Sequence, residues 1–191
     1  MFCRGKLPKL ATHNQSEGNQ LSTVNGQWST AKRAALLGLF AALAAALSAF
    51  EGALPPLPFL PPGAKAGLSN IAVLVAAGEL GFSGALSVAL FKGATAFFTR
   101  GAVAGLMSLS GGLVSAFIMT VAAKNGRFGF VGVGLWGALF HNLAQLAVAW
   151  LLIGRAVFYY LPVFMLLSLC TGSVTGLVAG LTVSAMRTIK N

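Results

Sequence analysis

Charged residues are scarce in this chain, and aspartate is absent altogether. Only 8% of its 191 residues are charged, whereas 57% are hydrophobic. In soluble domains roughly a quarter of all residues are charged. The carboxylates of the whole sequence are Glu17, Glu51 and Glu79. This composition excludes an ordinary soluble globular protein and predicts an integral membrane protein.

Cysteine and histidine are equally rare, and this excludes most metal and cofactor sites. The two cysteines, Cys3 and Cys170, lie too far apart for a ligand motif or a disulfide framework. Of the two histidines, His13 falls in the polar N-terminal stretch, so a bis-histidine haem site within the membrane is not expected. Magnesium-dependent diphosphate chemistry needs clustered carboxylates. We therefore expect no catalytic residues, no bound metal and no cofactor, and predict that the protein is not an enzyme.

The positive charge of the chain is distributed as membrane topology requires. The formal net charge is +10, but the basic residues stand in short clusters between apolar runs. Nucleic-acid binding needs a continuous basic surface, which such a chain has little room to build. We therefore expect a lipid membrane, and no nucleic acid, as the partner of these charges.

Six apolar runs follow a polar stretch at residues 1–33, which we interpret as a disordered cytoplasmic tail. About 20 residues cross the hydrocarbon core of a membrane. Residues 34–191 are therefore predicted to form an all-α domain of six transmembrane helices. The predicted spans are Ala34–Leu54, Ala66–Leu80, Phe82–Thr99, Ala102–Ala123, Phe128–Ile153 and Val157–Met186.

Counting basic residues on each side of these six spans predicts the orientation. Cytoplasmic loops carry the excess of lysine and arginine. With the N-terminus inside, the inner side holds nine such residues, namely Arg4, Lys6, Lys9, Lys32, Arg33, Lys124, Arg127, Arg187 and Lys190. The outer side holds three, Lys65, Arg100 and Arg155. Nine against three favours both termini in the cytoplasm.

Small residues recur every four positions in the first and last spans. Ala41, Ala45 and Ala49 form one such stripe, and Gly172, Gly176 and Gly180 form another. Stripes of this kind allow helices to approach closely in lipid. We interpret the glycine stripe as internal packing. The alanine stripe is compatible with internal packing or with docking of another membrane subunit.

The fifth span contains an unusual polar turn within "GALFHNLAQLAVAWLL", residues 137–152. His141, Asn142 and Gln145 lie within an arc of roughly 100° around the helix. Polar side chains at this depth are costly, so they mark functional sites or hydrogen-bond partners between helices. Because three such residues share one turn, we predict that they face a binding pocket.

With the predicted orientation the polar turn lies in the outer half of the bundle, and other polar residues are expected there too. Glu51, Lys65 and Asn70 fall at the outer ends of the first two spans or in the loop between them, and join the predicted ligand site. Lys92 and Arg100 of the third span are secondary candidates. Each has a structural alternative: the amides as contacts between helices, and Lys92 as a snorkelling or paired side chain.

Three stretches of the chain resemble a known family. "FEGALPPLPFLPPGAKAGLSNIAVLVA", "SLSGGLVSAFIM" and "GVGLWGALFHNLAQLAVAWLL" are similar to the Gx transporters, also labelled heptaprenyl diphosphate synthase component I. The resemblance extends from about Ala34 to Met186. The family in turn resembles the substrate-binding S subunits of energy-coupling-factor vitamin transporters, and it places this chain in a bacterial inner (plasma) membrane.

This resemblance implies a function in transport. It implies an S-component-like bundle that binds a small, vitamin-like solute under a lid, here Pro55 to Gly67. Partner ATPase subunits would supply the energy through a membrane coupling protein, which docks on an alanine stripe that Ala41, Ala45 and Ala49 match. The ligand candidates it implies are again Glu51, Lys65, Asn70, His141, Asn142 and Gln145.

Two other functions stay open at the level of the sequence. One is a membrane subunit of a flavin-linked electron-transfer system, which some members of the family accompany. The other is a non-catalytic membrane accessory to polyprenyl diphosphate synthesis.

Overall fold

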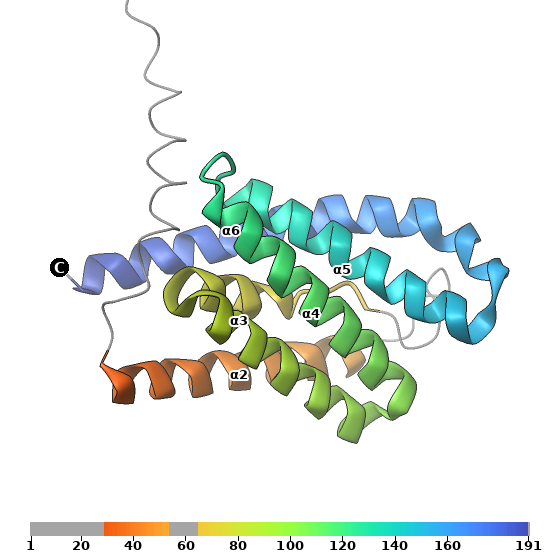
Figure 1. Ribbon diagram of the computed structural model, residues 1–191, viewed down its shortest axis with the longest axis horizontal. Helices are drawn as coiled ribbons and strands as arrows, with labels where there is room; N and C mark the ends of the chain where they lie inside the picture. The colour runs from red at the N-terminus through yellow and green to blue at the C-terminus, as the bar shows by residue number, and fades with distance from the viewer. Residues whose placement is uncertain (1–28, 54–64, 191) are drawn as a thin grey trace, which may run out of the picture.

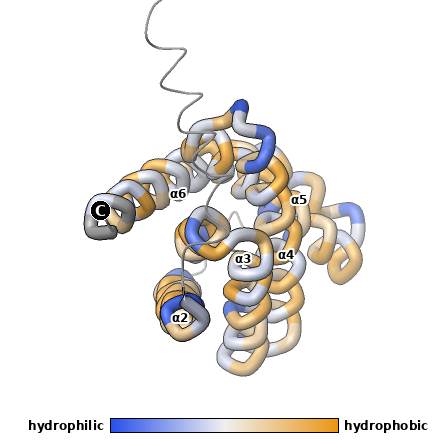
Figure 2. The backbone as a smooth tube through the Cα atoms, turned by 60° about the vertical axis from the view of Figure 1, so that its left-hand side comes forward, coloured by the Kyte–Doolittle hydropathy of each residue, from blue (hydrophilic) through white to orange (hydrophobic). Residues whose placement is uncertain are grey.

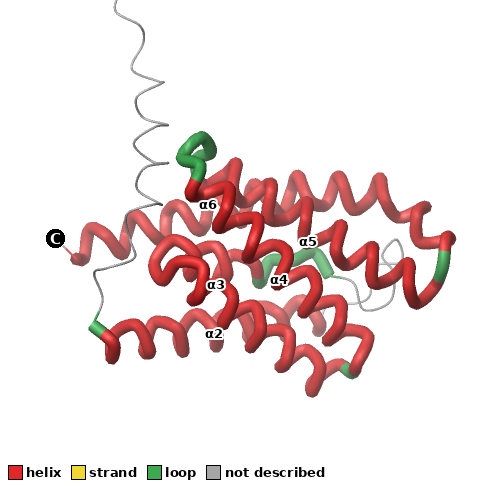
Figure 3. The backbone as a smooth tube through the Cα atoms, viewed as in Figure 1, coloured by secondary structure: helices red, strands yellow, loops and turns green. Residues whose placement is uncertain are grey.

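The computed structural model describes residues 29–53 and 65–190, and it builds them almost entirely from helices. The elements are α2 (Thr30–Ala53), α3 (Asn70–Arg100), α4 (Ala102–Lys124), α5 (Phe130–Ile153), the short 3-10 helix η1 (Arg155–Tyr160) and α6 (Leu161–Lys190) (Figure 1). Short connections join them from α3 onward, and the described residues contain no strand (Figure 3). Most of the predicted tail and residues 55–64 of the predicted lid lie outside the described residues.

The helices have the length and composition of membrane spans. Five of the described helical segments are long and apolar enough to cross a bilayer. Large apolar side chains cover their outer faces, and Phe98 is 85% exposed and Leu151 77% exposed. Hydrophilic residues gather near the helix ends and connections, while the helices are mostly hydrophobic (Figure 2). Such a surface is stable against lipid and not against water, so the chain is a multi-pass membrane protein.

The second and third predicted spans form a single element, α3, which is broken at Gly81. This glycine has φ 73° and ψ −163°, a left-handed conformation that favours glycine. Figure 1 shows the chain turning back at this break. The first part, Asn70–Leu80, has 11 residues and is therefore only about 16 Å long. Six separate spanning helices are not confirmed, because this first part is too short to cross the bilayer alone.

The first part of α3 forms the centre of the bundle. Its side chains from Ala72 to Ala76 are at most 1% exposed. They pack against apolar residues of α2, α4, α5 and α6 in one continuous core. A broken helix is tolerated at membrane depth when protein surrounds it, and this environment supplies that protection.

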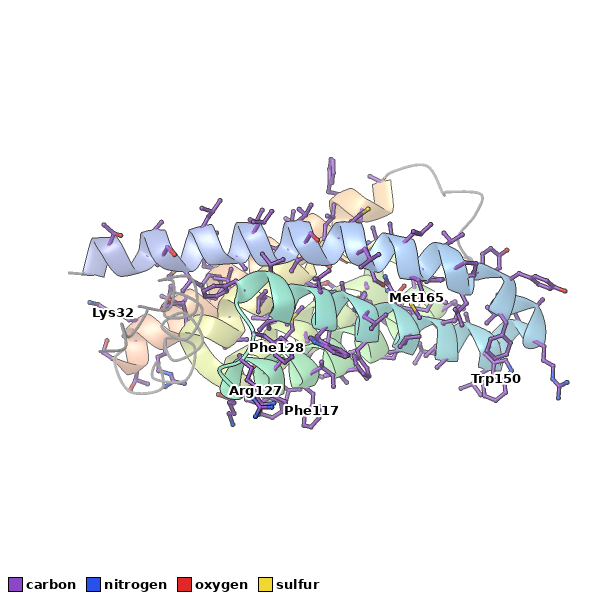
Figure 4. All side chains as sticks on the ribbon, turned by 90° about the horizontal axis from the view of Figure 1, so that it is seen from above. Lys32, Phe117, Arg127, Phe128, Trp150 and Met165 are labelled. Carbon is purple, nitrogen blue, oxygen red and sulfur yellow. The ribbon has the colours of Figure 1, made fainter. Side chains whose placement is uncertain are left out.

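The start of α2 and the end of α6 lie at the same end of the bundle (Figure 1). Lys32 lies at this end and Arg127 lies on the same half of the bundle, whereas Trp150 lies toward the opposite end (Figure 4). The beginning of the first described helix and the end of the last one thus share one end of the bundle.

Glycines allow α5 and α6 to touch along their backbones. An added Cβ at Gly134 would lie 2.5 Å from the Gly172 carbonyl oxygen, and one at Gly172 would lie 2.7 Å from the Leu135 Cα. No side chain fits into such a contact. The interpretation of the glycine stripe as internal packing is therefore confirmed.

This packing predicts different effects for two Gly→Ala substitutions. A Cβ at Gly176 would lie 2.6 Å from the Phe130 carbonyl oxygen, so Gly176→Ala must push α5 and α6 apart. We expect a loss of roughly 1–3 kcal/mol, typical of overpacking. Gly38→Ala is the matched control, because nothing lies within 4 Å of its added Cβ. The thermal midpoint of the purified protein in detergent measures both, and equal midpoints would contradict the backbone contact.

Candidate functional site

A non-helical segment, Lys65–Ser69, lies at the centre of the candidate site. It precedes α3, and Lys65, Gly67 and Ser69 are buried. Its backbone must find hydrogen-bond partners away from water. Side chains of α2 and α5 provide them, as described below.

Glu51 holds this segment from the end of α2. Its Oε1 accepts hydrogen bonds from the backbone N–H groups of Gly67 and Leu68, both at 2.7 Å. Gly67 has φ +90°, which favours glycine and lets two successive N–H groups point at one carboxylate oxygen. The other oxygen of Glu51, Oε2, is buried without a hydrogen-bond partner.

Gln145 holds the same segment from α5. Its Oε1 accepts a hydrogen bond from the Lys65 backbone N–H at 3.2 Å. Its Nε2 lies 2.8 Å from the Nε2 of His141, one turn earlier on the helix. If the Gln145 amide donates, His141 Nε2 accepts, and the ring proton then resides on Nδ1. His141 also packs closely against Gly67 and Gly111, since an added Cβ would lie 3.1 Å from its ring at Gly67 and would collide with it at 2.6 Å at Gly111.

Three basic side chains gather around the segment and the end of α2, and one of them, Lys65, belongs to the segment itself. Lys65 donates through Nζ to the carbonyl and hydroxyl oxygens of Ser48. Arg100 donates to the same hydroxyl at 3.2 Å. Lys92, which is 1% exposed, donates to Asn70 Oδ1 at 2.8 Å.

The environment of Lys65 lowers the pKa of its ammonium group. Burial lowers the pKa of the ammonium to about 8, and the positive charges of Arg100 and Lys92 act in the same direction. The nearby Glu51 carboxylate opposes this decrease. Lys65 is therefore still mostly charged at pH 7.

These groups enclose one small cavity of about 10 Å³. A cavity of this size holds about one water molecule. Its lining comes from four helices and the Lys65–Ser69 segment, namely Glu51, Lys65, Gly67, Ser69, Lys92, Ala104, Ser108, His141 and Gln145.

The structure brings most of the predicted ligand residues together, but Asn142 faces elsewhere. Its Nδ2 donates to Ser168 Oγ at 2.8 Å and to the Phe164 carbonyl oxygen at 3.5 Å, both on α6. Asn70 contacts Lys92, and Arg100 contacts the end of α2, so both belong to the cluster without lining its cavity. Asn142 thus connects α5 to α6.

Sequence reasoning missed several small residues of this site. Ser48 receives both Lys65 and Arg100, and Gly67 lies between the Asn70 amide and the His141 ring. Serine and glycine are common in membrane helices, so only the left-handed φ of Gly67 distinguishes it. Within the described ranges, no group of three His, Cys, Asp or Glu residues is placed to hold a metal ion.

The contacts of Glu51 predict how the segment responds to a substitution. Glu51→Ala leaves the Gly67 and Leu68 N–H groups without an acceptor, and hydrogen bonds to charged groups contribute about 1.5–3 kcal/mol each. Hydrogen–deuterium exchange of peptides spanning residues 65–69 should accelerate about tenfold or more. Ser87→Ala is the control, because this exposed hydroxyl bonds only within α3. Unchanged exchange in Glu51→Ala would show that Glu51 does not hold the segment.

Comparison with known proteins assigns the chain to a family. The family model for heptaprenyl diphosphate synthase component I matches residues 40–182, which include α3, α4 and α5 and most of α2 and α6. No curated protein and no solved structure gives a significant match. The chain belongs to the heptaprenyl diphosphate synthase component I family of Gx-type membrane proteins.

Proposed function

We propose that this protein is the solute-binding membrane subunit of a transporter of the energy-coupling-factor type. One observation carries the proposal: polar side chains of α2, α3 and α5 converge on the buried Lys65–Ser69 segment around a common cavity. Contacts between helices need single polar residues. A cluster from three helices that encloses space is typical of a binding site.

In this proposal the segment moves when a solute binds. A cavity of about 10 Å³ has no room for a vitamin-sized molecule. The Lys65–Ser69 segment is held by hydrogen bonds that it donates to Glu51, Gln145 and Ser48, and these bonds can break and form again. Its displacement would open the space beside His141. The predicted lid, Pro55 to Gly67, would then act through its described end.

The orientation follows from the distribution of basic residues. We place both termini in the cytoplasm of a bacterial cell, as the excess of nine basic residues over three favours. The end of the bundle with Trp150, opposite the start of α2, then faces outside (Figure 4). A solute would enter at this face.

The energy source in this proposal is a partner protein. The sequence contains no glycine-rich phosphate loop followed by Lys-Ser or Lys-Thr. Partner ATPases would therefore act through a coupling membrane protein. The docking surface is proposed on α2, which is the least buried of the spans.

The exposed small residues of α2 differ in part from the predicted stripe. Ala41 is 8% exposed and packs inside the bundle, Ala45 is half-buried, and Ala49 is exposed. The continuous exposed stripe is formed instead by Gly38, Ala42, Ala46 and Ala49. We propose this face for the docking partner.

A second candidate function is supported by the name of the family. A component I of a heptaprenyl diphosphate synthase would be a membrane subunit that accompanies the prenyl-transferring enzyme. The sequence has no aspartate, and its described carboxylates, Glu51 and Glu79, come from α2 and α3. The catalytic Mg²⁺ site would therefore belong to the partner. Co-purification of a prenyl-diphosphate-forming protein, with no released solute, would favour this candidate.

Solute binding can be tested with two neighbouring residues of α5. The protein is purified in mild detergent and denatured, and released small molecules are identified by mass spectrometry. We expect a bound solute in the wild type and at least about a tenfold loss in His141→Ala, because His141 lines the cavity. Asn142→Ala should lower the thermal midpoint but retain the solute, since Asn142 contacts α6. Absence of any solute from the wild type would contradict the proposal, and covalent flavin would support electron transfer instead.

Docking on α2 predicts that substitutions on this helix, but not on α3, release the partner protein. Ala42→Leu together with Ala46→Leu fills the exposed stripe and should block close approach of a partner helix. Ala94→Leu is the control, because Ala94 is exposed on α3. Affinity purification from native membranes, with quantification of co-purifying proteins, measures the effect. We expect loss of the partner only in the α2 variant, and equal recovery from both variants would place the docking surface elsewhere.

A further inference from the structure

The cavity of the candidate site has an unbalanced charge. Lys65 and Lys92 line it, and Arg100 lies beside Lys65 on the shared Ser48 hydroxyl. Glu51 is the carboxylate of this cluster. The formal charges of the four side chains therefore sum to +2 inside a bundle of apolar helices.

The hydrogen bonds of the cluster leave this excess uncompensated. Lys92 donates to a neutral amide oxygen, and Lys65 and Arg100 donate to oxygens of Ser48. Glu51 Oε1 is engaged by two backbone N–H groups. The polar partners of the three cations are thus neutral, which only partly offsets the cost of burying their charge.

No other carboxylate in the described residues is near enough to neutralise the positive charge of the cluster. Glu79, the only other acidic side chain in the described residues, lies nine residues beyond Asn70 on the same helix. Nine residues of α-helix extend about 13 Å. Glu79 therefore belongs to the opposite end of this part of α3, beside the break at Gly81.

The cluster also carries a donor that is not in use. Asn70 is 1% exposed and accepts from Lys92 through Oδ1, whereas its Nδ2 has no hydrogen-bond partner. A buried amide N–H without a partner is costly. It lies beside Gly67, 3.1 Å from the position that a Cβ there would occupy. Once the Lys65–Ser69 segment is displaced, an acceptor atom of a ligand beside Asn70 Nδ2 would satisfy it.

We propose that the ligand is an anion whose carboxylate or phosphate oxygens are bound by Lys92 and Lys65 and by the Asn70 amide. This inference rests on the proposed function and specifies its substrate class. Displacement of the Lys65–Ser69 segment brings the anionic group against Lys92. The ligand then supplies the negative charge that the protein lacks, and the single Glu51 carboxylate of the cluster weakens its binding by repulsion.

Two nearly isosteric substitutions with opposite effects on charge test the proposal. Lys92→Met removes one positive charge while keeping the length of the side chain, and its burial as an apolar group is favourable. Glu51→Gln removes the negative charge and keeps an acceptor oxygen for Gly67 and Leu68. An anion should bind about tenfold or more weakly to Lys92→Met and more tightly to Glu51→Gln. Lys65→Met is a second variant with the expected direction of Lys92→Met.

The measurement uses defined probes on the purified full-length protein in detergent at constant ionic strength. Succinate and inorganic phosphate are the anionic probes, and ethanolamine is the cationic control. Dissociation constants come from the shift of the thermal midpoint with probe concentration. The midpoint without probe confirms that each variant is folded. The endogenous solute released from the wild type is identified in parallel by mass spectrometry.

Each outcome decides the proposal. Anion binding that weakens in Lys92→Met and strengthens in Glu51→Gln supports it, as does an anionic endogenous solute. Anion binding that is unchanged in Lys92→Met overturns it by placing the anion elsewhere. A neutral or cationic endogenous solute overturns the anion and leaves the proposed function standing. Absence of both a probe effect and an endogenous solute overturns this inference and the proposed function together.

Discussion

The structure depends on the hydrogen bonds that a stretch of irregular backbone forms inside a membrane protein. Lys65–Ser69 lies buried before α3, where no lipid can accept its N–H groups. The Glu51 carboxylate and the Gln145 amide accept three of them from helices on either side of the segment. These bonds determine where α3 begins and connect α2 and α5 through the segment between them.

Close packing of helices is the condition for this arrangement. At Gly134 and Gly172 the backbones of α5 and α6 are in direct contact, and Gly111 leaves room for the ring of His141. Gly134 packs against α6 about two turns before the polar turn, where Gln145 bonds the Lys65–Ser69 segment. A larger residue at Gly111 would collide with His141 Nδ1 at 2.6 Å. The close packing of the helices and the geometry of the candidate site therefore depend on one another.

The charge of the cluster connects this architecture to function. A protein that needed only to fix the segment would achieve it with neutral partners, because buried charges contribute little net stability. Here Lys65, Lys92 and Arg100 surround one carboxylate. The free-energy cost of burying these three cations is explained if a bound solute balances their charge. Charged side chains at membrane depth generally mark functional sites.

The sequence by itself determined the membrane class, the approximate bounds of most helices and most of the residues of the polar cluster. Hydropathy and residue type are local properties, so α4 matches its predicted span to within one residue, Ala102–Lys124 against Ala102–Ala123. Only the tertiary structure decided that Asn142 faces α6 while His141 and Gln145 face the cavity. Helical periodicity places the three on one broad face, but that face contacts two neighbours. The contact between Glu51 and Gly67, 16 residues apart, likewise arises from packing, because nothing in local sequence specifies which backbone group a distant carboxylate will meet.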